Sequence, residues 1–375
     1  MFGIRSTAVP RQRRSASVWH VQPALPAYRF AYFSALYQRH GLTGGVLYPE
    51  KDTTGLAVEV LQSWQMPKGR TRKLPLGLLW QQDTLSVPLS RGDILVLASN
   101  PRYLTTLLLS LKARMRGARV VWWGHYWSST SRGWRMGLRI LLMRVANAVL
   151  FYTEREVEEY KARLGRHDER PILALNNGVN IAPIQIVRKT YLAGSRQREI
   201  LFVGRLTPKA EILLLVQALA LPQMKGIHLH VVGEGEESAR ARTAAETAGV
   251  SERITWHGIS TDEAVVGAIA NRCRLFVYPG QVGLSLIHAM AYGLPCIVHS
   301  DRWHHMPEIA AFETGRTGRA FKPDDAEDLA TVIANVIDDI DLLDCFSARC
   351  IEITETSFNT NNMAERFMDL VKRLQ

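Results

Sequence analysis

Residues 277–295 read VYPGQVGLSLIHAMAYGLP, and the order of residue types in this stretch decides the fold class. The apolar run Leu275–Tyr278 has the length of a buried strand, and a loop with two glycines follows it. A helix is then predicted from Leu284 to just before Gly293, where a nearby proline prevents its continuation. Free N–H groups and the helix dipole at such a start attract anions. The stretch predicts a ligand site at a strand end; the alternative is a plain strand–turn–helix around a buried histidine.

Four residues give this loop its predicted chemistry, two because they lack a side chain and two through the side chain that they carry. Gly280 and Gly283 leave room for a ligand to approach the backbone closely. Ser285 can cap the helix or donate a hydrogen bond to a phosphate, beside the N–H of Leu284. His288 lies one turn into the helix and is placed to bind a sugar or ribose hydroxyl.

A second segment, LFVGRLTPK at residues 201–209, has the same organisation. A buried strand ends at Gly204, and ligands of open α/β sheets bind at that edge. Arg205 offers a planar fork of donors suited to a diphosphate, and Lys209 follows four residues later. A surface salt bridge is the alternative role for these cations, but together with residues 277–295 they favour a phosphate site.

Short apolar runs alternate with amphipathic stretches along the whole chain, and this alternation predicts two doubly wound α/β domains. We expect a first domain at residues 1–178 with a loose tail at 1–17, a second at 179–355, and a C-terminal helix at 356–375. The polar segment Asn177–Ser195 is the predicted linker. The predicted strands are Val18–Val21, Gly45–Tyr48, Ile94–Ala98, Val120–Trp123, Val149–Tyr152, Ile172–Leu175, Ile200–Val203, Leu229–Val232, Ile254–His257, Leu275–Tyr278 and Pro295–Val298. The predicted helices include Tyr28–His40, Thr105–Arg116, Trp134–Ala148, Ile212–Leu219, Glu236–Ala248, Leu284–Tyr292 and Asn361–Leu374.

Charge is distributed unevenly between the two halves of this 375-residue chain. Residues 1–190 hold 28 Lys and Arg against 11 Asp and Glu, whereas residues 191–375 hold 18 against 24. The first half therefore suits an anionic partner, either nucleic acid or an acidic membrane surface. The basic residues are scattered and follow no nucleic-acid-binding motif, which favours the membrane.

Location is predicted from three further features of the sequence. The four cysteines show no paired spacing, which fits a reducing compartment. The basic start of the chain lacks the apolar core of a secretory signal, and no apolar stretch is long enough to span a bilayer. We expect a cytoplasmic protein that is soluble or peripheral on the inner face of the cell membrane.

Candidate residues also occur in the first half. His125 follows a strand, where a neutral imidazole can accept a proton or orient a hydroxyl, although a lone histidine is more often structural. Trp123 and Tyr126 beside it could stack on sugar rings or simply pack. The helix predicted at residues 132–148 has an apolar stripe flanked by arginines, and it suits either a membrane interface or its own sheet. His288, His299, His304 and His305 match no zinc spacing, so no metal is expected.

Together these segments resemble the group 1 glycosyltransferases, family 4 of the retaining enzymes with the GT-B fold. Residues 201–209 are similar to the family's phosphate-binding Gly-Arg-Leu segment, and residues 277–295 to its donor loop and helix. Met306-Pro-Glu308, the TGRTG at 314–318 and Asn177-Gly-Val-Asn180 are similar to further family motifs. The resemblance departs where the family usually has a lysine and two glutamates, at Ala210, Gly280 and His288. A histidine in the second glutamate's place resembles a branch of the family from bacterial surface-polysaccharide clusters.

The resemblance implies two Rossmann-like domains facing each other across a cleft, with the last helix bracing the first domain. It implies transfer of a sugar, with retention, from a nucleotide diphosphate sugar to a saccharide. Because fixed cations and dipoles meet the phosphate charge, we expect no metal or other cofactor, and the basic first domain with Arg29 favours a lipid-linked acceptor. Arg205, Lys209 and the helix start at Gly283 and Leu284 would stabilise the leaving diphosphate. The other expected donor-site residues are Gly204, Gly280, Ser285, His288 and Glu308. His125 is expected to be catalytic by orienting the acceptor hydroxyl, and Arg29, Trp123 and Tyr126 are expected to bind the acceptor.

Three other functions remain compatible with these motifs. A sugar-nucleotide epimerase of the same fold would need no acceptor and no basic first domain. An inactive nucleotide-sugar-binding protein is suggested by Gly280, His288 and Ala210. A nucleic-acid binder is the third, and the acidic second half argues against it.

Overall fold

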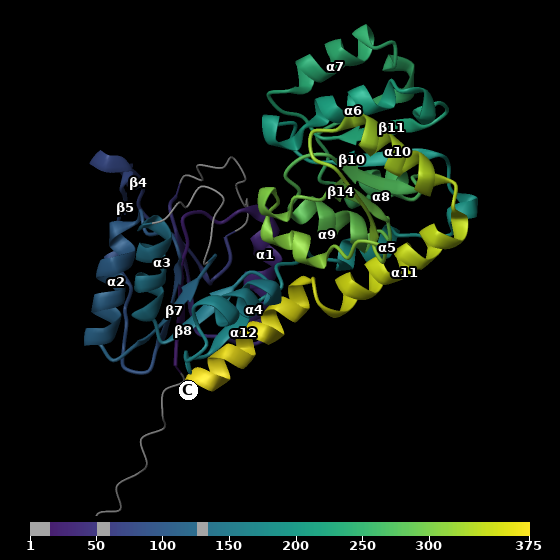
Figure 1. The fold of residues 1–375 in the computed structure, drawn as a ribbon. Helices are drawn as coiled ribbons and strands as arrows, with labels where there is room; N and C mark the ends of the chain where they lie inside the picture. The colour runs from purple at the N-terminus through teal and green to yellow at the C-terminus, as the bar shows by residue number, and fades with distance from the viewer. Residues whose placement is uncertain (1–15, 51–60, 126–133) are drawn as a thin grey trace, which may run out of the picture.

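The computed structural model describes residues 16–50, 61–125 and 134–375, which fold around two parallel β-sheets (Figure 1). The first sheet has seven strands in the order β3-β2-β1-β6-β7-β8-β9. Its central strands are apolar on both faces because helices cover both, as parallel sheets require. The strands are β1 Val18–Val21, β2 Gly44–Tyr48, β3 Gln65–Pro67, β6 Ile94–Ala98, β7 Arg119–Trp123, β8 Ala148–Phe151 and β9 Ile172–Ala174.

The second sheet has six parallel strands in the order β12-β11-β10-β13-β14-β15. In both sheets the strand order reverses once, beside β1 in the first and beside β10 in the second, and open α/β sheets bind ligands at such a point. The strands are β10 Glu199–Val203, β11 His228–Val232, β12 Ile254–Gly258, β13 Leu275–Tyr278, β14 Cys296–His299 and β15 Gly318–Phe321.

The helices cover the sheets from both sides and enclose separate cores. In the first domain α1 and α12 bury one face of the sheet, while α2, α3 and α4 cover the other. The helices are α1 Ala27–Ser34, α2 Leu104–Met115, α3 Trp134–Arg144, α4 Glu154–Arg163, α5 Ala182–Val187, α6 Ile212–Leu219, α7 Ser238–Thr247, α8 Glu263–Ala270, α9 Leu284–Ala291, α10 Ala326–Ile337, α11 Ile340–Thr356 and α12 Thr360–Leu374.

The chain crosses between the domains twice, and the two crossings touch. Gly178 lies so close to the second crossing that a Cβ there would be 2.2 Å from the carbonyl of Phe358. The N–H of Thr360 donates to the carbonyl oxygen of Val179 at 3.0 Å. After this crossing α12 runs along the first domain, where Phe367 packs against Tyr32 (Figure 1).

Several elements differ from the sequence-based expectations. The strands β3 and β15 were not predicted, nor was the antiparallel hairpin of β4 Thr71–Lys73 and β5 Leu79–Gln81. The segment expected to be a plain linker contains α5, whose Ile184 is fully buried in the second core. The helix expected to reach Ala148 ends at Arg144, because Ala148 begins β8 beside β7.

Candidate active site in the cleft between the domains

The side of the cleft where the sequence predicts the donor begins where β10 ends. The N–H of Gly204 donates to the carbonyl oxygen of Val232, and a Cβ on Gly204 would lie 2.9 Å from the ring of Tyr278. Arg205 and Lys209 follow, both exposed, and neither has a side-chain partner among the described residues. The structure thus places these two cations, without partners among the described residues, at the predicted sheet edge. The alternative role, a surface salt bridge, would require an acidic partner.

Gly280 has a structural role that the sequence did not predict. A Cβ at this position would lie 2.1 Å from the carbonyl oxygen of Lys209, which also accepts a hydrogen bond from the N–H of Gln281 at 2.7 Å. Backbone therefore fills the space that a side chain would take, so a glycine is needed here for the two loops to meet, and donor binding by Gly280 stays a prediction. The contact joins the two loops of the donor side, and Ala210, which is buried, packs into the same junction.

The start of α9 faces the opening between the domains. Gly283 caps the helix without a side-chain hydrogen bond, and a Cβ there would lie 3.7 Å from Oε2 of Glu308. Leu284, Ser285 and His288 line a pocket of about 890 Å³ whose opposite wall includes Tyr28 and other residues of α1. The pocket therefore lies between the two domains, and its size suits part of a nucleotide sugar.

His288 is held by residues that the sequence analysis did not single out. Its Nε2 lies 3.0 Å from Oε2 of Glu263, which also accepts a hydrogen bond from the Tyr292 hydroxyl at 2.6 Å. Burial raises the pKa of Glu263, but the hydrogen bonds from His288 and Tyr292 outweigh it and bring the pKa below its usual value. A carboxylate thus fixes the imidazole ring at the pocket wall.

The first domain brings a second histidine to the cleft. Nδ1 of His125, just after β7, lies 3.0 Å from Oε1 of Glu156. The other oxygen of Glu156 accepts hydrogen bonds from the N–H groups of Tyr152 and Thr153, in a capping box that starts α4. The side chain of Glu156 is 4% exposed, so this buried carboxylate fixes the ring of His125 through Nδ1.

Arg29 is a buried cation among aromatic rings. Its guanidinium lies 4.6 Å from the ring centroid of Trp123 and 5.5 Å from that of Tyr152. Burial raises the pKa of Tyr152 to about 12, so its hydroxyl stays neutral. Nη1 of Arg29 is buried and has no hydrogen-bond partner among the described residues. Tyr126, the other residue expected to bind the acceptor, lies outside the described residues.

Glu308 comes from the second domain and meets these first-domain groups. Asn177, just past β9, donates its side-chain N–H to Oε1 of Glu308. Burial raises the pKa of Glu308, and the hydrogen bond from Asn177 and the charges of His125 and Arg29 offset this only in part. Oε2 of Glu308 and Oδ1 of Asn177 are both buried without a partner in the described part of the chain. Buried polar atoms usually have partners, so these open positions indicate a polar ligand.

The comparisons with known proteins agree with this geometry. A glycosyltransferase from Rickettsia africae superposes with a TM-score of 0.71 at 16% identity, covering 96% of this chain and 98% of that one. The Anabaena protein HepE in complex with UDP and glucose gives 0.66 at 13% identity, covering 96% and 100%. The fold is GT-B. Residues 184–351, most of the second GT-B domain, match the family model described as "Glycosyl transferases group 1".

One curated relative also matches. An exopolysaccharide phosphotransferase of Streptomyces coelicolor is 26% identical over 242 residues, which are 62% of this chain. The chain spans about a quarter of that relative's length, since the match covers 24% of it.

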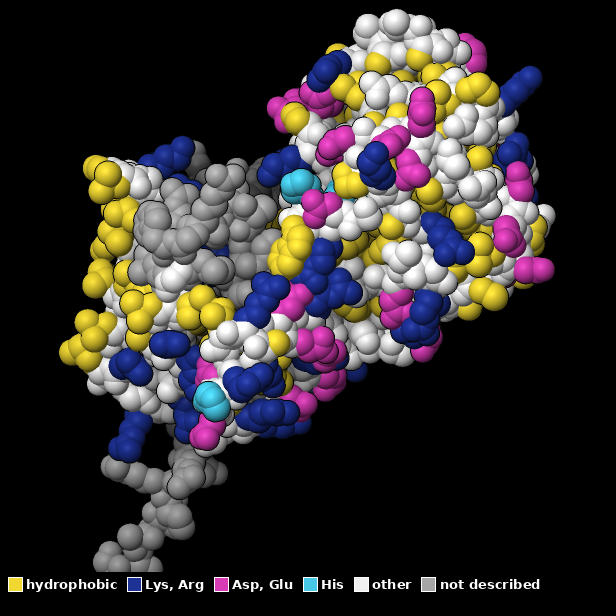
Figure 2. Space-filling model, viewed as in Figure 1, with side chains coloured by type: hydrophobic (Ala, Val, Ile, Leu, Met, Phe, Trp, Pro, Cys, Tyr) yellow, Lys and Arg dark blue, Asp and Glu magenta, His cyan; other side chains and the backbone are white. Residues whose placement is uncertain are grey.

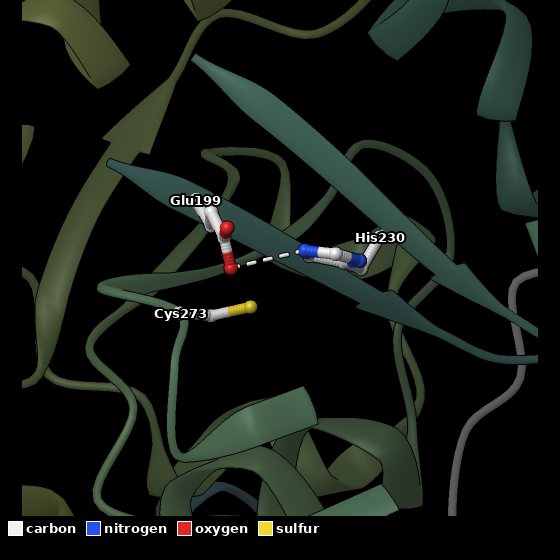
Figure 3. A group of neighbouring side chains, drawn as sticks. All are labelled: Glu199, His230 and Cys273. Atoms are coloured by element: carbon white, nitrogen blue, oxygen red, sulfur yellow. Dashed lines mark hydrogen bonds and ion pairs between the residues drawn. The ribbon is translucent and has the colours of Figure 1, made fainter. Parts of the chain in front are cut away.

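The described residues include one group able to hold a metal ion, and it lies away from the GT-B cleft. Glu199, His230 and Cys273 place one ligand atom each within 4.8 Å of one another, near the amino ends of β10 and β13 (Figure 3). The carboxylate oxygens of Glu199 already pair with His230 at 3.0 Å and with Arg272 at 2.6 Å. The expected donor-binding residues lie at the opposite edge of this sheet.

The roles of four residues of the GT-B cleft escaped the sequence analysis for identifiable reasons. Glu156 had a local signal, the Thr153-Glu-Arg-Glu156 capping box, but the pattern predicts a helix start and not a histidine partner. Glu263 and Tyr152 reach His288 and Arg29 from other elements, and no spacing in the sequence encodes that contact. Asn177 was noted only as part of a junction motif, and its contact with Glu308 requires the folded chain.

Proposed function

We propose that this protein is a retaining family 4 glycosyltransferase that moves a sugar from a nucleotide diphosphate sugar to a saccharide acceptor. One observation carries the proposal. A pocket between the domains is lined by α9 and α1, exposed cations without described partners follow β10, and buried polar atoms without described partners come from both domains. Such a cleft fits an anionic leaving group on one side and sugar hydroxyls on the other.

The donor diphosphate would lie at the edge formed by β10 and α9. Arg205, Lys209 and the N–H groups at the start of α9 would stabilise the charge that grows on the leaving phosphate. Fixed cations and dipoles would meet this charge without a metal ion. His288, held by Glu263, would hold the ribose or the donor sugar by a hydrogen bond.

The acceptor would bind against the first domain, between Arg29 and His125. The bond between the anomeric carbon and the phosphate oxygen breaks, and the acceptor oxygen bonds that carbon on the same face. The acceptor proton passes to the leaving phosphate oxygen, and His125 orients the hydroxyl that loses it. Glu308 would accept a hydrogen bond from a donor hydroxyl through Oε2.

The acceptor we propose is a lipid-linked saccharide of bacterial surface polysaccharide synthesis, at the inner face of the membrane. The basic first half of the chain and the exopolysaccharide-related match support this class of acceptor. None of the helices that the structure describes is both long and apolar enough to cross a bilayer, so the proposed association is peripheral.

The experiment combines binding with turnover. A thermal-shift panel of UDP-, GDP- and ADP-sugars identifies the donor class, and release of nucleotide diphosphate on adding acceptor measures transfer. The variant His125→Ala should keep the thermal shift and lose transfer by about 10²–10⁴-fold. His40→Ala is the matched control, because His40 lies on the surface opposite Glu365. Isomerisation of the donor alone would indicate an epimerase, and binding without turnover an inactive protein; either result contradicts the proposal.

A further inference from the structure

Helix α2 exposes apolar residues on its outer face, unlike a typical helix at the surface of an isolated domain. The face that it buries contains the polar residues Thr105, Thr106 and Ser110 beside Leu109 and Ala113. The exposed fractions of Leu108, Leu111 and Met115 on its outer face are 43%, 57% and 78%. A surface helix normally turns its apolar stripe inward, so this reversed pattern indicates that something else covers the outer face.

The apolar surface extends beyond α2 on both sides. We define the α2 surface by six exposed residues of the first domain: Leu76, Leu85, Leu108, Leu111, Met115 and Leu141. The hairpin of β4 and β5, which presents Leu76, is tied to the start of α2 by the bridge between Leu79 and Tyr103. Figure 2 shows hydrophobic side chains along the edge of the first domain that this hairpin and α2 occupy in Figure 1.

The charge around this surface is almost entirely positive. Residues 61–150 contain 14 Lys and Arg but only two acidic residues, Asp83 and Asp93. Asp93 is buried and accepts hydrogen bonds from the N–H groups of Ser17 and Ser90, so it does not reach the surface. Arg114 and Arg116 are exposed beside Met115. The surface therefore combines exposed leucines with neighbouring arginines, and Asp83 is the one exposed acidic residue of this segment.

We propose that the α2 surface docks on an anionic lipid bilayer. Apolar side chains would enter the boundary between headgroups and acyl chains, while the surrounding arginines contact the lipid phosphates. A protein partner or a second copy of the chain would also cover leucines, but the nearly complete absence of exposed acidic residues favours a polyanionic surface. This assigns docking mainly to α2 and its hairpin, and the helix that the sequence suggested, at residues 132–148, contributes Leu141.

The position of the α2 surface suits the proposed acceptor. The strands β6 and β7, which flank α2 in the chain, end at the edge of the sheet that carries Trp123 and His125. An acceptor anchored in the bilayer would thus reach the cleft from the first-domain side. The link between docking and access to the acceptor rests on the proposed function. Docking itself needs neither donor nor acceptor.

The test is co-sedimentation of the full chain with vesicles that contain no substrate. Phosphatidylcholine vesicles with and without 30% phosphatidylglycerol separate lipid charge from lipid in general, and a salt series measures the electrostatic part. The variant Leu108→Gln/Leu111→Gln/Met115→Gln should bind the anionic vesicles at least 10-fold more weakly than the wild type. Leu192→Gln, an equally apolar change at a residue that is 55% exposed in the second domain, is the control and should bind as the wild type does.

Two results would overturn the proposal. One is equal vesicle binding by the triple variant and the wild type, or no binding by either. The other is a wild-type dimer in light scattering that the triple variant abolishes, which would make the α2 surface an interface between copies. Circular dichroism checks that the variant is folded, and transfer to a soluble acceptor shows whether the proposed function stands when docking fails.

Discussion

Arg205 illustrates how much of the donor site depends on single residues. The sequence placed it after a buried strand, and the structure leaves its guanidinium exposed at the sheet edge without a partner among the described residues. An arginine with no structural contact is free to bind a ligand, and its removal should not disturb the fold.

We therefore expect Arg205→Ala to lower kcat by about 10²–10³-fold, the usual effect of losing one donor to a developing negative charge. The melting temperature without ligand should stay the same, because no described contact is lost. Steady-state kinetics and calorimetry measure the two effects. Arg373→Ala, an exposed arginine on α12, is the control; transfer at the wild-type rate in Arg205→Ala would remove Arg205 from the mechanism.

Neutralising Glu308 should lower the transfer activity and raise the stability of the protein. Burial raises its pKa, so the folded protein disfavours the carboxylate. Glu308→Gln keeps an acceptor for Asn177 and removes the charge. We expect the variant to lose transfer while its free energy of unfolding at pH 7 rises, because a buried charge is removed.

The pH dependence of this gain has a definite sign. The wild type loses stability relative to Glu308→Gln as the pH rises from the ordinary glutamate pKa through the raised folded value. At lower pH both side chains are neutral and the difference should vanish. Urea unfolding across pH 4–8 measures it, with Glu365→Gln as the exposed control. A difference that grows at low pH would contradict the assignment.

At the scale of elements, α12 links the end of the chain to the first domain. The sequence predicted an amphipathic helix with one apolar face, and Phe367 on that face is fully buried against His20 and Tyr32. Asn359 caps the helix by accepting from the N–H of Asn362 at 2.8 Å. Amphipathicity is a local property, so the sequence could predict the helix, whereas its docking surface is built by β1 and α1.

We expect Phe367→Ala to destabilise the first domain by about 3–5 kcal/mol, the cost of removing a buried aromatic ring. Lys372→Ala, on the exposed face of α12, should change stability by less than about 0.5 kcal/mol. Hydrogen exchange should show the loss of protection in β1 and α1, while the second sheet keeps its protection. Uniform loss in both domains would mean that α12 does not belong to the first domain's core.

At the scale of the whole molecule, the relative position of the domains depends on few side-chain contacts. Arg302 of the second domain pairs with Glu159 on α4 of the first, and Asn177 pairs with Glu308 near the crossing. Such sparse polar contacts allow the domains to open and close around a substrate.

Removing the ion pair between Arg302 and Glu159 tests whether the domains open and close in this way. Arg302→Ala should change the free energy of unfolding by less than about 1 kcal/mol, since a partly exposed ion pair contributes little. We expect small-angle scattering to show a larger radius of gyration without ligand, and KM for the donor to rise more than kcat falls. Arg316→Ala removes an ion pair within the second domain, with Glu313, and should leave the scattering unchanged.

The sequence by itself determined the two sheets, their central strands and the loops that carry Arg205 and the start of α9, because strand burial and helix termination depend on neighbouring residues. Only the tertiary structure decided that Gly280 serves the junction between two loops, that Glu156 and Glu263 hold the two histidines, and that α2 turns its leucines outward. These facts depend on which elements meet across the sheets and the cleft, and residues far apart in the chain leave no local pattern that predicts such contacts.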